Sequence, residues 1–367
     1  MIMQTERKIR VLIVDDSNII RQLFAHMLSS DPGIEVVGFA PDPYVAREKL
    51  VELKPDVMTL DIQMPNMDGL TFLEKVMEHF PIPTIVISSY AKENSQTALR
   101  ALSIGAVDIF AKPILDKKTP MESVSAELIA KVRAAAGANV SNIRSMNLSD
   151  PLKTNVKKAQ PSKTTKNNKI ILAIAASTGG TEALKHLLSH MPEDIPGTVI
   201  VQHMLKEFTK GFAETLNNIC PFEVKEAESN DIVQPGRVLL APGGFHMILA
   251  RHGTQFCVRL KDGPLLHGVK PAADPLFSSV AQLVGKNAIG VVLTGMGYDG
   301  AQGLLEMKNA GSFNIVQDEK TSVVFGMPKE AIEIGASHIV LPLQKIAKSI
   351  MDVCTNRELK QNSSLPI

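Results

Sequence analysis

Three polar residues after residue 169 have the types and order of a nucleophile, its base and an orienting carboxylate: Ser177, His203 and Asp299. Each ends or follows an apolar stretch typical of a buried strand, namely IILAIA (170–175), TVIVQH (198–203) and AIGVVLTG (288–295). Parallel strands bring their carboxyl ends to one edge of a sheet, so we expect the three side chains to meet there. Ser177 would then attack, His203 would take its proton, and Asp299 would hold the imidazole in the useful tautomer.

Each of these residues also has a structural interpretation. Ser177 can cap the helix expected over 181–190, His203 can be an ordinary hydrogen-bonded histidine, and Asp299 can open a turn with Gly300. A phosphate-binding loop is a further reading of the turn ASTGG, but G-x-x-x-x-G-K-[ST] and G-x-G-x-x-G are both missing. The combination of three strand ends favours the catalytic interpretation.

A second polar group follows the apolar stretches of the first half: Asp15 and Asp16 after VLIV, Asp61 after VMTL, Ser88 at the end of TIVIS, and Lys112 after VDIF. Each aspartate alone can cap the helix that follows it. Carboxylates gathered at one sheet edge repel one another unless a cation is present, and an oxygen-only cluster suits Mg²⁺. Such a site would let Asp61 attack a phosphoryl donor while Lys112 and Ser88 hold the transferred oxygens.

The length of 367 residues favours two domains, and repeated strand–helix alternation predicts an α/β fold in both. Residues 1–136 are expected to form a flavodoxin-like (βα)5 domain, and 170–355 a doubly wound, mostly parallel domain with an antiparallel edge hairpin at 246–260. The segment 151–169 is lysine-rich without acidic residues, so we expect a flexible basic linker over 137–169. A polar tail is expected over 356–367.

Composition excludes several classes of protein. The formal net charge of +1 gives no reason to expect a nucleic-acid partner. The 3 cysteines are scattered and lack metal-ligand spacing, which suits a reducing compartment. Neither a signal-peptide pattern nor an apolar stretch of membrane-spanning length is found in the sequence. A cytoplasmic protein without membrane insertion is the expectation.

The motifs VLIVDDS, LDIQMPNMDG and Lys112-Pro113 make residues 9–136 resemble the receiver domain of two-component response regulators. This resemblance implies that Asp61 is the phosphoacceptor and that a histidine kinase is the phosphodonor. It also implies that Asp15, Asp16 and Asp61 hold Mg²⁺ together with the backbone carbonyl of Gln63. Ser88 and Lys112 would form the switch that responds to phosphorylation.

The order Ser177, His203, Asp299 and the motifs ASTGG, VQHM, LAPGGFHM and LTGMGYDGA resemble the catalytic domain of chemotaxis protein-glutamate methylesterases. Gly295, Met296 and Gly297 form a small-residue loop that can present N–H groups to an oxyanion. The resemblance favours the Met296 N–H as donor, with Gly297 beside it, and makes Thr178 an active-site neighbour. Ala175 and Leu205 depart from the family, which commonly has glycine and proline there.

The resemblance implies a phosphorylation-activated hydrolase that removes methyl groups from glutamate esters on chemoreceptors, without a cofactor for the esterase reaction. Many members also deamidate receptor glutamines, and both reactions pass through an acyl-serine. Three alternatives remain from the residues alone: a receiver-regulated esterase acting on another ester or in another pathway, a DNA-binding response regulator, and an inactive adaptor. The charge and the missing helix-turn-helix pattern count against the second, and the complete triad against the third.

Overall fold

The computed structural model describes residues 7–64, 67–89, 94–113, 120–142 and 170–362. The chain divides into two compact units, Met1–Asn147 and Leu148–Ile367, which are described separately below. Most of the linker expected over 137–169 lies outside the described residues. Within the described ranges, no helix is both long and apolar enough to cross a membrane.

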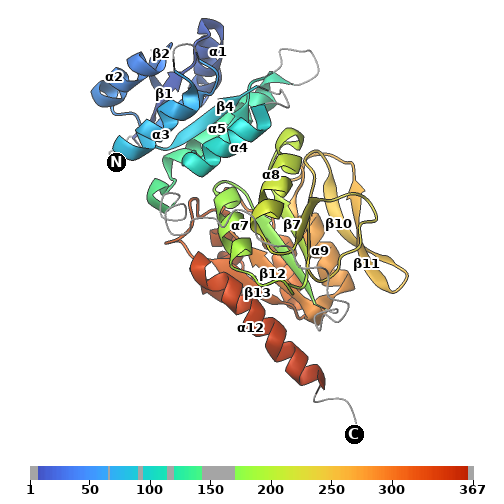
Figure 1. Cartoon of the computed structure of the whole chain (residues 1–367). Coiled ribbons are helices and arrows are strands. Elements are labelled where there is room, and N and C mark those ends of the chain that lie inside the picture. The colour runs from blue at the N-terminus through green and yellow to red at the C-terminus, as the bar shows by residue number, and fades with distance from the viewer. Residues whose placement is uncertain (1–6, 65–66, 90–93, 114–119, 143–169, 363–367) are drawn as a thin grey trace, which may run out of the picture. The chain divides into compact units, whose positions relative to one another are not determined.

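The first unit is a five-stranded parallel sheet with helices between successive strands (Figure 1). Its strand order is β2-β1-β3-β4-β5, which is the flavodoxin-like order expected from the sequence. The elements in chain order are β1 (Ile9–Val14), α1 (Asn18–Ser29), β2 (Ile34–Ala40), α2 (Pro43–Leu53), β3 (Val57–Asp61), α3 (Gly69–His79), β4 (Thr84–Ser88), α4 (Asn94–Ile104), β5 (Asp108–Ala111) and α5 (Met121–Ala136).

The central strands of this sheet are buried along their whole length. All five residues of β3 and of β4 are buried, as expected when helices cover both faces of a parallel sheet. Short polar side chains start the helices: Asp42 accepts N–H bonds at α2, Asp68 at α3 and Ser17 at α1. Polar residues at the carboxyl ends of β1, β3, β4 and β5 are therefore held on rigid strands.

The second unit is a seven-stranded parallel sheet in the order β14-β13-β12-β6-β7-β9-β8, again with helices around it (Figure 1). Its elements are β6 (Ile171–Ala176), α7 (Gly180–Ser189), β7 (Gly197–Gln202), α8 (Lys206–Ile219), β8 (Glu223–Glu226), β9 (Arg237–Leu240), β10 (His246–His252), β11 (Gln255–Lys261), α9 (Ala273–Leu283), η1 (Gly285–Asn287), β12 (Ala288–Val292), α10 (Ala301–Asn309), β13 (Phe313–Gln317), α11 (Met327–Glu333), β14 (Ile339–Leu341) and α12 (Leu343–Asn362).

The core of the second unit shows that both faces of the sheet are covered. Alternate residues of β6, namely Ile171, Ala173 and Ala175, join one apolar cluster with residues of α9, α10 and α11. The intervening residues of β6 are buried on the opposite face of the sheet. Because both faces are covered, every residue of this strand is apolar. This is the doubly wound arrangement predicted from the sequence.

Two details of this unit differ from the expectation. The hairpin β10–β11 forms its own two-stranded antiparallel sheet, which packs on α9, and does not extend an edge of the main sheet. The edge strand β8 was not predicted, because EVKE contains a single apolar residue and is too short to stand out. The last helix of the unit, α12, continues through residue 355 to Asn362.

Candidate active site and phosphorylation site

A cluster of acidic residues lies at the carboxyl edge of the first sheet. Asp61 is the last residue of β3, and Asp15 and Asp16 follow β1. Each of the three offers a carboxylate oxygen, and these oxygens lie within 4.8 Å of one another. Lys112, which follows β5, places its Nζ 2.7 Å from Asp61 Oδ2 and 2.9 Å from Asp15 Oδ2. The structure therefore brings together the residues that the sequence predicted would meet there.

The charges of this cluster are only partly balanced. Burial raises the pKa of Asp61, and the opposing effect of the Lys112 ammonium is too small to reverse the shift. Burial alone would lower the pKa of Lys112, but its contacts with Asp61 and Asp15 leave it raised. Asp15 Oδ2 is buried and receives no well-directed hydrogen bond, although Lys112 lies nearby. Oxygen ligands with an unused buried lone pair fit a hard cation such as Mg²⁺.

Neither Asp15 nor Asp16 caps α1, which was the structural alternative. The cap is Ser17, whose hydroxyl accepts the Ile20 N–H, while Asp15 Oδ1 accepts the Ser17 N–H at 2.9 Å. The other oxygen of Asp15 thus remains directed at the cluster.

The two remaining residues predicted for this site flank Asp61. The Gln63 N–H donates to Asp61 Oδ1 at 3.3 Å, which holds the backbone after β3 against the carboxylate. Ser88 is the buried last residue of β4, and its carbonyl accepts the Lys112 N–H at 2.7 Å. Residues 65–66 of the motif LDIQMPNMDG lie outside the described residues.

Ser177 occupies the tight turn between β6 and α7. The helix cap is Gly179, in the left-handed conformation with φ 75°, and no side chain caps the helix. The alternative in which Ser177 serves as the N-cap is therefore wrong. A Cβ on Gly179 would lie 2.5 Å from Val323, so the turn requires glycine for space as well as for its conformation.

The loop after β12 packs directly on this turn. The Ser177 N–H donates to the Thr294 carbonyl at 3.0 Å. A Cβ added to Gly295 would lie 2.8 Å from the Ser177 Cβ, so only glycine permits this approach. Ser177 is thus fixed between the ends of β6 and β12, while its side chain remains partly exposed.

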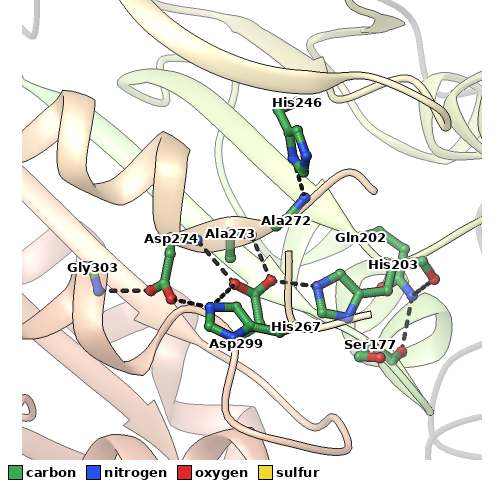
Figure 2. Close-up of polar contacts among 10 residues, drawn as sticks. All are labelled: Ser177, Gln202, His203, His246, His267, Ala272, Ala273, Asp274, Asp299 and Gly303. Atoms are coloured by element: carbon green, nitrogen blue, oxygen red, sulfur yellow. Dashed lines mark hydrogen bonds and ion pairs between the residues drawn. The ribbon is translucent and has the colours of Figure 1, made fainter. Parts of the chain in front are cut away.

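His203 follows β7 and connects to the end of β12 through Asp299. Its Nε2 lies 2.7 Å from Asp299 Oδ2, and both side chains are nearly buried. Figure 2 shows Ser177 on the side of the imidazole away from Asp299. With Nε2 engaged by the carboxylate, Nδ1 is the ring nitrogen left to take a proton from Ser177. Among the described residues, no hydrogen bond joins Ser177 Oγ to the ring, which is common before substrate binds.

Asp299 is saturated with hydrogen bonds. Besides His203, its Oδ2 accepts the Ala273 N–H at 2.6 Å, and its Oδ1 accepts the Asp274 N–H at 3.1 Å. Burial alone would raise the pKa of Asp299, but the bond from His203 and the two N–H groups hold it below its ordinary value. The side chain is a fixed anion, as an orienting carboxylate must be.

The loop at 295–297 provides two N–H groups beside Ser177. Within the described part of the chain, neither the Met296 nor the Gly297 N–H takes part in a hydrogen bond. Gly297 has φ 81°, and a Cβ on Gly326 would lie 2.9 Å from the Gly297 nitrogen. Gly326 and Met327 both donate to the Gly295 carbonyl, which anchors the loop and leaves the two donors available for an oxyanion.

Two residues that support this site were not singled out from the sequence. Gln202 is buried, and its Nε2 donates to the carbonyls of Ser177 at 2.9 Å and His203 at 3.2 Å (Figure 2). Thr294 is also buried, and its hydroxyl bonds the Thr178 carbonyl at 3.0 Å while accepting N–H groups from the segment at 323–324. Both residues lie inside the quoted motifs VQHM and LTGMGYDGA, so proximity to His203 and Asp299 was the available signal.

Comparisons with known proteins agree with this arrangement. Residues 11–124 match the response regulator receiver domain family, and residues 172–350 match the family described as CheB methylesterase. A protein-glutamate methylesterase/protein-glutamine glutaminase of Bdellovibrio bacteriovorus is 56% identical over 347 residues, covering 94% of this chain and 97% of its own. A second protein of that description, from Syntrophus aciditrophicus, is 52% identical over 344 residues and covers 94% of this chain and 98% of its own.

Solved structures match each unit separately. The crystal structure of the CheB methylesterase catalytic domain of Thermotoga maritima is 38% identical, covers 50% of this chain and 98% of its own, and gives a TM-score of 0.49. The response regulator domain of CheB from the same organism is 41% identical, covers 36% of this chain and 99% of its own, and gives 0.33. The chain thus belongs to the protein-glutamate methylesterase/protein-glutamine glutaminase family, in which a receiver domain precedes a CheB methylesterase domain.

Proposed function

We propose that the chain is a phosphorylation-activated hydrolase of glutamate methyl esters on methyl-accepting chemoreceptors, and that it also deamidates receptor glutamines. The observation that carries this proposal is the 2.7 Å bond between His203 and Asp299 at the sheet edge where Ser177 lies. The names of the relatives supply the substrate class. Chemotaxis adaptation is the process in which such a reaction would act.

The proposed reaction begins when Ser177 Oγ attacks the carbonyl carbon of the ester, and His203 Nδ1 takes the hydroxyl proton. The negative oxygen that forms is bound by the Met296 and Gly297 N–H groups. The imidazolium then gives its proton to the departing methoxide, so methanol leaves and an acyl-serine remains. Water attacks this ester by the same route and releases the glutamate carboxylate. A glutamine substrate would lose ammonia in place of methanol.

Asp299 supports each step as a permanent anion. It keeps the proton of the neutral imidazole on Nε2, which leaves Nδ1 free to act as a base, and it stabilises the imidazolium that follows. The Ala273 N–H on Oδ2 and the Asp274 N–H on Oδ1 keep the carboxylate from rotating.

The receiver is proposed to control this activity through phosphorylation of Asp61 by a histidine kinase. Asp15, Asp16 and Asp61, with the carbonyl of Gln63, would hold Mg²⁺ in this site. When bound there, Mg²⁺ would supply positive charge that offsets the carboxylates and the phosphoryl oxygens. Lys112 now contacts the Asp61 carboxylate and, after phosphorylation, would pair with an oxygen of the phosphoryl group. Ser88 would bind a second phosphoryl oxygen.

Methanol release from radiolabelled, methylated receptor membranes tests the proposal. We expect wild-type release to rise when a small-molecule phosphodonor is added, Asp61→Asn to lose that rise, and Ser177→Ala to release no methanol. Ser189→Ala, at the far end of α7, is the matched control. Release by Ser177→Ala at the wild-type rate would refute the nucleophile. If wild type released nothing from any receptor yet hydrolysed a soluble ester, the substrate would be another ester.

A further inference from the structure

A second histidine–aspartate pair lies on the other side of Asp299 from His203. The His267 Nε2 is 2.9 Å from Asp274 Oδ2 and 4.0 Å from Asp299 Oδ1 (Figure 2). His267 has no role in the proposed reaction. In the tautomer that has its proton on Nε2, His267 donates a hydrogen bond to Asp274.

This pair is connected to the triad through the first turn of α9. Asp274 Oδ1 accepts the Gly303 N–H at 2.7 Å, so both of its oxygens are bonded. The backbone N–H of the same residue donates to Asp299 Oδ1, and the preceding N–H, from Ala273, donates to Asp299 Oδ2. Whatever fixes the Asp274 side chain therefore also fixes two hydrogen-bond donors of Asp299.

The loop that carries His267 is built to hold it in place. Leu266 and Val269 exchange two backbone hydrogen bonds, of 3.1 and 2.9 Å, across a tight turn. His267 has φ 53°, a left-handed conformation that residues other than glycine adopt at a cost, and such strain often occurs at functional positions. Its ring also packs edge-on against Tyr298, the neighbour of Asp299, with 4.8 Å between centroids.

The charges around His267 give it an electrostatic role. It faces Asp274 on α9, and Asp299 and Tyr298 on the loop after β12, while His203 lies beyond Asp299. On its own loop, Lys270 is engaged by Asp262. Burial, together with the charge of Asp299, raises the pKa of Asp274. His267 thus donates to Asp274 and lies 4.0 Å from Asp299, the neighbouring carboxylate.

We propose that His267 is a positioning residue of the triad, which, through Asp274, keeps Asp299 in place and limits the negative potential that acts on His203. This inference rests on the proposed function. Without His267, the paired carboxylates would hold a proton on His203 more strongly, so the base would become available only at higher pH. The first turn of α9 would also lose one of the two hydrogen bonds that hold the Asp274 side chain, and Asp299 would shift relative to His203.

The test measures methanol release by the phosphorylated full chain as a function of pH. His267→Ala is expected to lower turnover about tenfold, since small displacements of catalytic groups are costly, and to move the acid limb of the pH profile to higher pH. His267→Gln supplies a neutral N–H donor for Asp274. It should recover most of the turnover at pH values above the acid limb, while the limb itself stays at the higher pH seen in His267→Ala. His252→Ala, exposed at the tip of the β10–β11 hairpin, is the control.

Unchanged turnover and an unchanged limb in His267→Ala would overturn the proposal. Lower turnover at every pH with the limb in place would also overturn it, because that result indicates only structural damage. The rate at which an organophosphonate labels Ser177 gives a second pH profile that needs no receptor. If wild type is labelled but releases no methanol, the proposed substrate fails, and the labelling profiles of the two variants still decide the role of His267.

Discussion

Asp61 ends a buried central strand of one parallel sheet, and Asp299 lies in the loop after a buried central strand of the other. Their surroundings shift the pKa of the carboxyl group in opposite directions. Asp61 shares its pocket with two other carboxylates and a single ammonium group, and its pKa is raised, mainly by burial. Asp299 accepts three hydrogen bonds from His203 and two N–H groups, and its pKa is lowered despite burial. The number of donors aimed at the carboxylate accounts for the difference.

The carboxyl edge of a parallel sheet can therefore hold two carboxylates with different chemical tasks. A carboxylate that must accept a phosphoryl group needs an accessible oxygen and room for a cation, which full hydrogen bonding would remove. An orienting carboxylate must keep one charge and one position through the whole reaction, which full hydrogen bonding provides. The four predictions below alter one side of this comparison at a time.

The largest effect is expected from Asp299→Asn. An amide presents either an N–H or a weak acceptor to His203, so the imidazole loses its fixed tautomer, and turnover should fall about 10⁴-fold. The rate of methanol release by the phosphorylated chain measures it. Asp352→Asn, on an exposed position of α12, should leave the rate unchanged. A loss below tenfold would show that Asp299 does not orient the base.

A large loss of stability is expected from Lys112→Met. The change leaves Asp15 and Asp61 buried beside each other without their counter-charge, which should cost about 3 kcal/mol in metal-free buffer. Mg²⁺ should return part of this, because a ligand that binds only the folded state stabilises it. Hydrogen exchange at the β1 and β3 amides measures the change in the first unit. Lys75→Met, exposed on α3, is the control, and a loss that Mg²⁺ leaves untouched would contradict the expected cation site.

Much of the fold could be predicted because apolar runs are long and regular. The stretch TIVIS forms the strand at 84–88, and the strand order of the first sheet follows from its repeated βα units. The hairpin at 246–260 was correctly predicted, but its placement at a sheet edge was wrong, since local alternation does not show which surface a hairpin packs on. The strand at 223–226 carries too little apolar signal to be predicted.

The candidate sites also contain residues that the sequence predicted and residues that it did not. That the triad residues and the acidic residues would each gather at a sheet edge was predictable, because their members end or follow strands and topology alone brings strand ends together. Their chemical roles stay predictions. Gln202, Thr294 and His267 act through hydrogen bonds to backbone groups or to other side chains. Such roles depend on atomic distances across the chain, for which the residue type gives no signal.

A moderate effect is expected from Thr294→Val, which keeps the side-chain shape and removes the hydroxyl. The Thr178 carbonyl and the N–H groups of Val323 and Val324 lose their buried partner, so the free energy of unfolding of the second unit should fall by about 2 kcal/mol. Turnover should also fall, because the turn at Ser177 loses support. Denaturant unfolding and methanol release measure the two effects.

Thr198→Val is the matched control for that change. Thr198 is fully buried at the opposite end of the sheet, on β7, where its hydroxyl makes one bond, of 2.8 Å, to the Pro196 carbonyl. This variant should lose less stability and keep its turnover. Equal turnover in both valine variants would show that Thr294 has no influence on the catalytic edge.

The smallest effect expected is on the free energy of unfolding, which should change with opposite signs when each of the two carboxylates is replaced by an amide. A carboxylate with a raised pKa costs stability once the pH rises through its folded value, so Asp61→Asn should stabilise the metal-free first unit at neutral pH, by on the order of 1 kcal/mol. A carboxylate with a lowered pKa contributes stability that is complete above its ordinary value and lost as the pH falls through the folded value. Asp299→Asn should therefore destabilise the second unit at neutral pH.

Hydrogen exchange of each unit at neutral and acidic pH would measure both signs in the full chain. The gain from Asp61→Asn should shrink as the pH falls, because the wild-type carboxyl then becomes neutral, and it should disappear in Mg²⁺, which the aspartate would bind and the asparagine would not. The loss from Asp299→Asn should also shrink in acid but should not respond to Mg²⁺. Two changes of the same sign would mean that hydrogen-bond count does not separate the two carboxylates, and that packing around each side chain decides its stability.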